Sequence, residues 1–86
     1  MDPNEVRNSL RAFVLKELLN NPSYPIEDDE PLITSGLVDS LSLALIGVFA
    51  EESFGVYIPD TDLTAENLDT LNQMVDRIVS DGNRET

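Results

Sequence analysis

The feature that most constrains the fold is an apolar segment in the middle of the chain, residues 41–50, which reads LSLALIGVFA. Together with Gly55 just beyond it, this segment predicts a helix from about Ser40 to Glu52 or Ser53. Its apolar side chains surround the helix axis, whereas a surface helix of a small domain normally has one polar face. Because 86 residues rarely enclose a helix completely, we expect one apolar side to be exposed.

The two sides of this helix separate when residues are placed about 100° apart around the axis. The side that we assign to the core consists of Leu43, Ile46, Gly47, Ala50 and Phe54. The outer side consists of Leu41, Ala44, Leu45 and Val48, next to Glu51 and Glu52. We interpret the outer side as a surface that meets a partner or covers a cargo. The alternative is a central helix that is buried on both sides.

The N-terminal part predicts a helix followed by a long loop. Asp2, Pro3 and Glu5 form a capping-box pattern at the start of the helix, which should end before Pro22. Residues 20–39 then contain three prolines, an acidic run and isolated apolar residues. A loop of this length is uncommon in a compact domain unless it is functional. We therefore expect its apolar residues to pin it across the helices.

The C-terminal part predicts two more helices. A short one is expected around residues 64–67, and Thr70 with Gln73 repeats the capping-box spacing ahead of a final helix that ends near Gly82. No strand signal competes with these patterns. We therefore predict an all-α fold, a four-helix bundle with a long loop between the first two helices and a short third helix. It should form a single domain over residues 1–86, with an ordered core at about 3–81.

The composition excludes several functions. The chain has 5 Lys and Arg against 17 Asp and Glu, with neither histidine nor cysteine, and its formal net charge is −12. It therefore lacks the usual general base and transition-metal ligands, so we expect no enzyme activity and no metal site. The negative charge opposes binding to nucleic acid or to anionic membranes. The chain has neither a membrane-spanning run nor the basic start of a secretory signal, so we expect it in the cytoplasm. We also expect it to be a monomer.

A serine lies at the expected junction of the long loop and the second helix, within the sequence GLVDSL of residues 36–41. A serine that follows an aspartate at a helix start is most often an N-cap, and we expect either Asp39 or Ser40 to cap this helix. Ser40, however, is expected to be exposed between an ordered loop and an apolar outer side. The chain has no histidine of its own to activate this hydroxyl.

On these residues the chain resembles the acyl carrier proteins. The triplet Asp39-Ser40-Leu41 is similar to the attachment motif of the family, and residues 49–55, the turn at residues 58–59 and the final helix fall in the family's order. The resemblance spans essentially the whole chain. It implies that Ser40 receives 4′-phosphopantetheine from coenzyme A through a separate phosphopantetheinyl transferase. It also implies that Asp39 helps to hold the metal or basic groups near the phosphate during transfer.

The resemblance further implies a carrier of acyl or aminoacyl thioesters, which a loading enzyme charges and downstream synthase or tailoring enzymes use. Ser42 and Leu45 occupy positions where fatty-acid-synthesis carriers usually have acidic residues. The chain therefore looks more like freestanding carriers of polyketide or nonribosomal-peptide biosynthesis. The alternatives are a fatty-acid-synthesis carrier and, in a different class, a non-covalent acidic helical adaptor. The expected partner surface is Leu41, Ala44, Leu45, Val48, Glu51 and Glu52.

Overall fold

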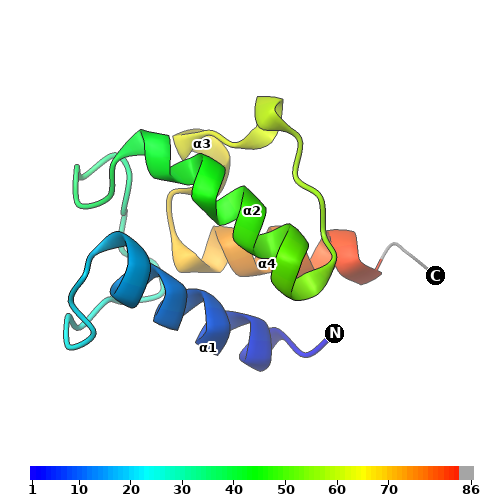
Figure 1. Ribbon diagram of the computed structural model, residues 1–86, viewed down its shortest axis with the longest axis horizontal. Helices are drawn as coiled ribbons and strands as arrows, with labels where there is room; N and C mark the ends of the chain where they lie inside the picture. The colour runs from blue at the N-terminus through cyan, green and yellow to red at the C-terminus, as the bar shows by residue number, and fades with distance from the viewer. Residues whose placement is uncertain (84–86) are drawn as a thin grey trace.

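The computed structural model describes residues 1–83, which form four α-helices and contain no strand. The helices are α1 (Pro3–Phe13), α2 (Leu43–Phe54), α3 (Ala65–Leu68) and α4 (Leu71–Asn83). Figure 1 shows α4 behind α1 and α2, with the short α3 at one end of the group. The prediction of an all-α fold with a long first loop and a short third helix is confirmed. In this part of the chain, no helix combines the length and the apolar character needed to cross a membrane.

α1 starts at the predicted place but with a different capping contact. The Asp2 carboxylate accepts a hydrogen bond from the backbone N–H of Asn4 at 2.9 Å, rather than from Glu5 as a capping box requires. The helix then continues into a π-helical turn, Val14–Leu18. The chain leaves this turn at Asn20, whose φ is 53°, so the helical segment ends before Pro22 as expected.

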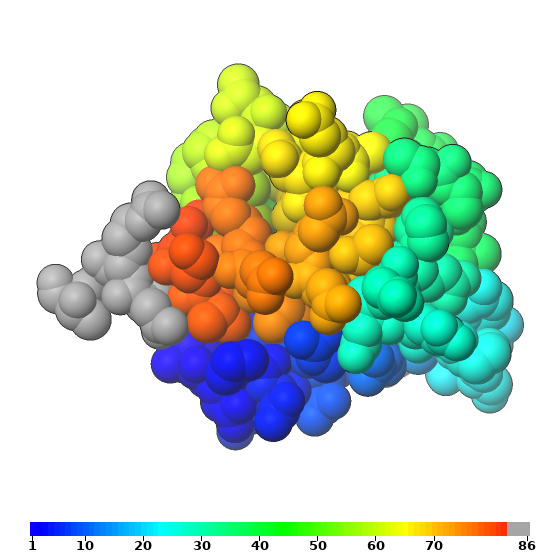
Figure 2. Space-filling model, turned by 180° about the vertical axis from the view of Figure 1, so that it is seen from behind, coloured from blue at the N-terminus to red at the C-terminus, as the bar shows by residue number. Residues whose placement is uncertain are grey.

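The loop between α1 and α2 is ordered and crosses the helices. The Asp28 carboxylate forms ion pairs with Arg7 at 3.4 Å and also with Arg11. The backbone carbonyl of Asp28 accepts a hydrogen bond from the N–H of Asn72 at 3.0 Å. In Figure 2 the teal surface of the loop lies against the yellow and orange surface at the start of α4. The apolar loop residues that are buried in the core are Ile26, Leu32 and Val38. Those that pack against it are Tyr24, Ile33 and Leu37.

The predicted capping box at the start of α4 is complete. The Thr70 hydroxyl accepts from the backbone N–H of Gln73 at 3.1 Å, and the Gln73 side chain accepts from the N–H of Thr70 at 3.1 Å. Thr64 caps α3 in a similar way. These contacts satisfy backbone donors that a helix start otherwise leaves without a partner. α4 ends one residue beyond Gly82.

α2 packs one face into the core, as the sequence predicts. Leu43, Ile46, Gly47 and Ala50 are buried, and the helix ends at Gly55, whose φ of 69° lies in the left-handed region that glycine adopts without strain. Burial of this face against α4 and the loop fixes the direction of α2. The largest fully buried side chains of the whole core include Leu10, Leu32, Ile46, Leu68, Leu71, Met74 and Ile78.

Candidate functional site

The junction of the loop and α2 exposes both Asp39 and Ser40. A 3₁₀ turn, Ser40–Ser42, leads into α2, and Asp39 is its N-cap. The Asp39 carboxylate accepts a hydrogen bond from the backbone N–H of Leu41 at 2.8 Å. The capping role that a serine usually has at such a position therefore belongs to Asp39 and not to Ser40.

The Ser40 hydroxyl is consequently available for chemistry. Within residues 1–83 it makes no hydrogen bond, and the side chain beside it, Leu41, is 81% exposed. An exposed hydroxyl without a structural role can accept a group from another enzyme without disturbing the fold. The chain has no histidine, the side chain that most often serves as the general base for a serine hydroxyl.

The predicted outer side, which runs along α2 and the 3₁₀ turn before it, is exposed. Leu41, Leu45 and Val48 are 81%, 53% and 51% exposed, and Ala44 is also exposed. We refer to these four residues as the apolar stripe. Large apolar side chains that share one exposed face are typical of a surface that binds another molecule. The two acidic residues beyond the stripe, Glu51 and Glu52, are exposed as well.

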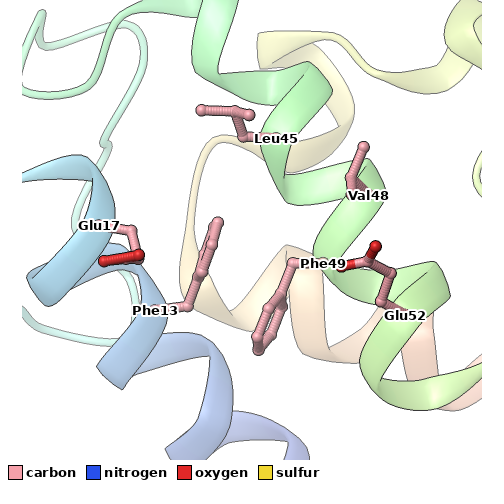
Figure 3. A pocket seen from close by; sticks show the side chains of 6 residues that line it. All are labelled: Phe13, Glu17, Leu45, Val48, Phe49 and Glu52. Carbon is pink, nitrogen blue, oxygen red and sulfur yellow. The ribbon is translucent and has the colours of Figure 1, made fainter.

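A groove runs beside the apolar stripe, between α2 and the end of α1 (Figure 3). The rings of Phe13 and Phe49 stack between the two helices, with their centroids 4.3 Å apart. The groove encloses about 280 Å³. We call it the α1/α2 groove. Its lining residues are Phe13, Glu17, Leu45, Val48, Phe49 and Glu52.

The contribution of α1 to this surface was not predicted from the sequence. Phe13 and Glu17, at the end of α1 and in the π-helical turn after it, come beside Leu45 where the ring of Phe13 stacks on Phe49 of α2. No spacing along the chain indicates that contact. The described residues contain no group of three or more side chains able to hold a metal ion. The residues predicted from the sequence therefore form two neighbouring parts of one surface. One is the exposed Ser40 with Asp39 before it, and the other is the apolar stripe with acidic residues at its edge.

Comparison with known proteins decides the family. Residues 10–78 match the family model described as a phosphopantetheine attachment site. An acyl carrier protein from Acidothermus cellulolyticus is 35% identical over 69 residues, which cover 80% of each chain. The chain belongs to the acyl carrier protein family.

As an acyl carrier protein, the chain is a carrier and not a catalyst, and its cofactor is covalently attached 4′-phosphopantetheine. Membership also implies interaction with a transferase and with biosynthetic enzymes. The residues at the start of α2 fit such a group, because Ser40 offers an exposed hydroxyl that no other described residue uses. The family therefore favours the carrier class over the adaptor class considered from the sequence.

Proposed function

We propose that Ser40 is the attachment residue and that this acyl carrier protein holds acyl or aminoacyl intermediates as thioesters on the phosphopantetheine thiol. The observation that carries the proposal is the exposed Ser40 hydroxyl without a hydrogen-bond partner in residues 1–83. The neighbouring serines are less suited. The Ser35 hydroxyl donates to the carbonyl of Leu32 and accepts from the N–H of Leu37, and Ser42 is partly buried.

The chemistry required of this chain is small. In the transfer, the Ser40 oxygen forms a bond to the phosphorus of the phosphopantetheinyl group, while the phosphoanhydride bond of coenzyme A breaks and the adenosine bisphosphate leaves with the electron pair. The hydroxyl proton goes to a base of the transferase, because this chain has no histidine. One carboxylate oxygen of Asp39 accepts from the N–H of Leu41 and so caps the 3₁₀ turn. We assign to this exposed carboxylate the role of holding the metal or basic groups of the transferase. The start of α2 also favours negative charge nearby, typically by about 0.3–1 kcal/mol.

The apolar stripe and the α1/α2 groove together are the proposed docking surface for the loading and downstream enzymes. Three carboxylates border it, those of Glu17, Glu51 and Glu52, and none of them forms an ion pair in the described part of the chain. The chain as a whole carries a net charge of −12. The partner surface that fits is therefore an apolar side chain flanked by Lys or Arg.

Intact-protein mass spectrometry tests the attachment residue. The protein is incubated with coenzyme A, Mg²⁺ and a broad-specificity phosphopantetheinyl transferase, and the wild type should gain the mass of one phosphopantetheinyl group. Ser40→Ala should gain nothing and should change the free energy of unfolding by less than about 0.5 kcal/mol, because Ser40 is not the cap. Ser35→Ala and Ser42→Ala are the matched controls and should both be modified. A mass gain in Ser40→Ala would place the attachment elsewhere.

The biosynthetic context is proposed to be of the polyketide or nonribosomal-peptide type. The support is the residue type along the exposed part of α2. Leu45 is 53% exposed and is apolar, whereas most fatty-acid-synthesis carriers have an acidic residue at this position. Loading assays on the modified protein test this proposal. Charging by an adenylating ligase or by polyketide enzymes would support it, whereas efficient elongation by a fatty acid synthase system with no such charging would contradict it.

A further inference from the structure

Asp69, between α3 and α4, binds three consecutive residues of the long loop. One carboxylate oxygen accepts from the backbone N–H groups of Ile33 at 2.7 Å and Thr34 at 3.0 Å. The other accepts from the Thr34 hydroxyl at 2.6 Å, and the Asp69 backbone carbonyl accepts from the N–H of Leu32 at 2.8 Å. Four hydrogen bonds therefore join one residue at the start of α4 to one short stretch of loop.

Asp69 is itself held in place by α4. Gln73 accepts from the backbone N–H of Asp69 at 2.8 Å and from that of Thr70 at 3.1 Å. The Gln73 amide also donates to the carbonyl of Glu66 at 3.0 Å. The carboxylate that binds the loop is thus held by hydrogen bonds at the corner between α3 and α4.

The loop stretch that Asp69 holds continues directly to Ser40. The N–H of Gly36 donates to the carbonyl of Ile33 at 3.0 Å, and the N–H of Val38 donates to that of Leu32 at 2.8 Å. These bonds fold residues 32–38 into a closed turn, which we call the Asp69-bound turn. Only Asp39 separates the turn from Ser40, so the position of the turn sets where the chain enters the 3₁₀ turn of α2.

Apolar burial alone would not fix this position. Leu32 and Val38 are buried at the two ends of the turn, but hydrophobic contact is non-directional and tolerates a shift or rotation of the backbone. Hydrogen bonds require defined distances and angles. The four bonds to Asp69 therefore determine the orientation of the turn, while the buried side chains supply most of its stability.

We propose that Asp69 is a positioning residue for phosphopantetheinyl transfer, which acts by holding the Asp69-bound turn and thereby presenting the Ser40 hydroxyl to the transferase. The proposal depends on the proposed attachment at Ser40. It concerns a residue that does not touch the reacting atoms. The apolar stripe, which we assign to docking, is not part of the Asp69-bound turn.

The test is the steady-state kinetics of modification of the whole apo-protein by the transferase with coenzyme A and Mg²⁺. Asp69→Ala should lower kcat by about tenfold or more, since misplacing a reacting group by about 1 Å can cost up to about a hundredfold, while KM for the carrier changes much less. Asp69→Asn keeps an oxygen that can accept from Ile33 and Thr34, and should restore most of kcat. Amide hydrogen exchange at Ile33 and Thr34 should accelerate in Asp69→Ala far more than in Asp69→Asn.

Two further variants separate positioning from a loss of stability. Ile78→Val, a fully buried site on α4, lowers the unfolding midpoint through the core without touching the turn, and should keep the wild-type kcat. If Asp69→Ala does not fold, Thr34→Val removes the hydroxyl bond from the other side and should lower kcat in the same direction. Wild-type kcat in a folded Asp69→Ala or Thr34→Val variant, or an equal fall in Ile78→Val, would overturn the proposal. Modification of Ser40→Ala would instead overturn the attachment at Ser40.

Discussion

On α4 an outward polar side chain is paired: the Arg77 guanidinium donates to Asp62 at 2.8 Å and to Asp81 at 2.6 Å. On α2 the outward side chains include Leu45 and Val48, which are apolar and about half exposed. Both helices bury an apolar face in the same core, so the fold does not require an apolar outer face on α2. The difference indicates that the outer face of α4 contributes to stability, whereas that of α2 is available for recognition.

The largest expected effect lies on the inner face of α2. Ile46→Ala should lower the free energy of unfolding by about 3 kcal/mol, because it removes a fully buried side chain and leaves a cavity. For a domain of this size that is a large part of the total stability. Urea unfolding followed by circular dichroism measures it. A loss below about 1 kcal/mol would mean that the two faces of α2 differ less than their burial indicates.

The next largest effect on stability is expected from the hydrogen bonds of Asp69. Burial from water tends to raise the pKa of Asp69, but the hydrogen bonds from Thr34 and Ile33 together outweigh it and lower the pKa below its ordinary value. The resulting stabilisation is complete above the unfolded-state pKa of about 3.9 and is lost as the pH falls through the lower folded-state pKa. Asp69→Asn should therefore cost about 1–2 kcal/mol at pH 7, and the difference from wild type should shrink toward pH 2.

This difference isolates Asp69, because the other carboxylates titrate in both proteins. It is measured as the free energy of unfolding in urea at a series of pH values. A difference that stays constant down to pH 2 would show that the charge of Asp69 does not contribute to holding the loop.

A smaller loss is expected on the outer face of α4. Arg77→Gln should cost about 1 kcal/mol, near the upper end for surface pairs, because the guanidinium contacts two carboxylates and is only 27% exposed. Lys16→Gln is the control, since Lys16 is exposed and forms no ion pair within residues 1–83. Thermal unfolding in low salt compares the two. Equal midpoints would show that the paired outer face of α4 adds nothing to stability.

Much of the fold could be predicted because it depends on local signals. The capping box of Thr70 and Gln73 forms as its spacing predicts, and Gly55 ends α2 in the left-handed conformation. The grouping of α2 side chains into two sides follows from helical geometry, and the small size of the chain predicts that one side is exposed. These features need only residues that are close in the sequence.

The features that could not be predicted depend on contacts between distant residues. Asp69 binds Thr34 across the fold, and a lone aspartate between two helices has no pattern that identifies its partner. Phe13 stacks on Phe49, which brings α1 into the surface beside α2. At the site itself, Ser40 and its exposure followed from the sequence, but which of two adjacent residues caps the helix depended on the backbone conformation of Asp39.

The smallest effect on stability is expected on the apolar stripe, where Leu45→Glu should change the free energy of unfolding by less than about 0.5 kcal/mol, because the side chain is 53% exposed. The same variant should weaken transfer of the acyl group to or from partner enzymes, since a charge would replace the apolar contact. Ser80→Glu is the matched control, because it adds the same charge to an exposed position of α4 and should leave transfer unchanged. KM for the carrier in the loading reaction measures the effect. A fall of several kcal/mol in stability would mean that Leu45 packs in the core, and equal KM values for the two variants would mean that recognition depends on overall charge and not on the outer face of α2.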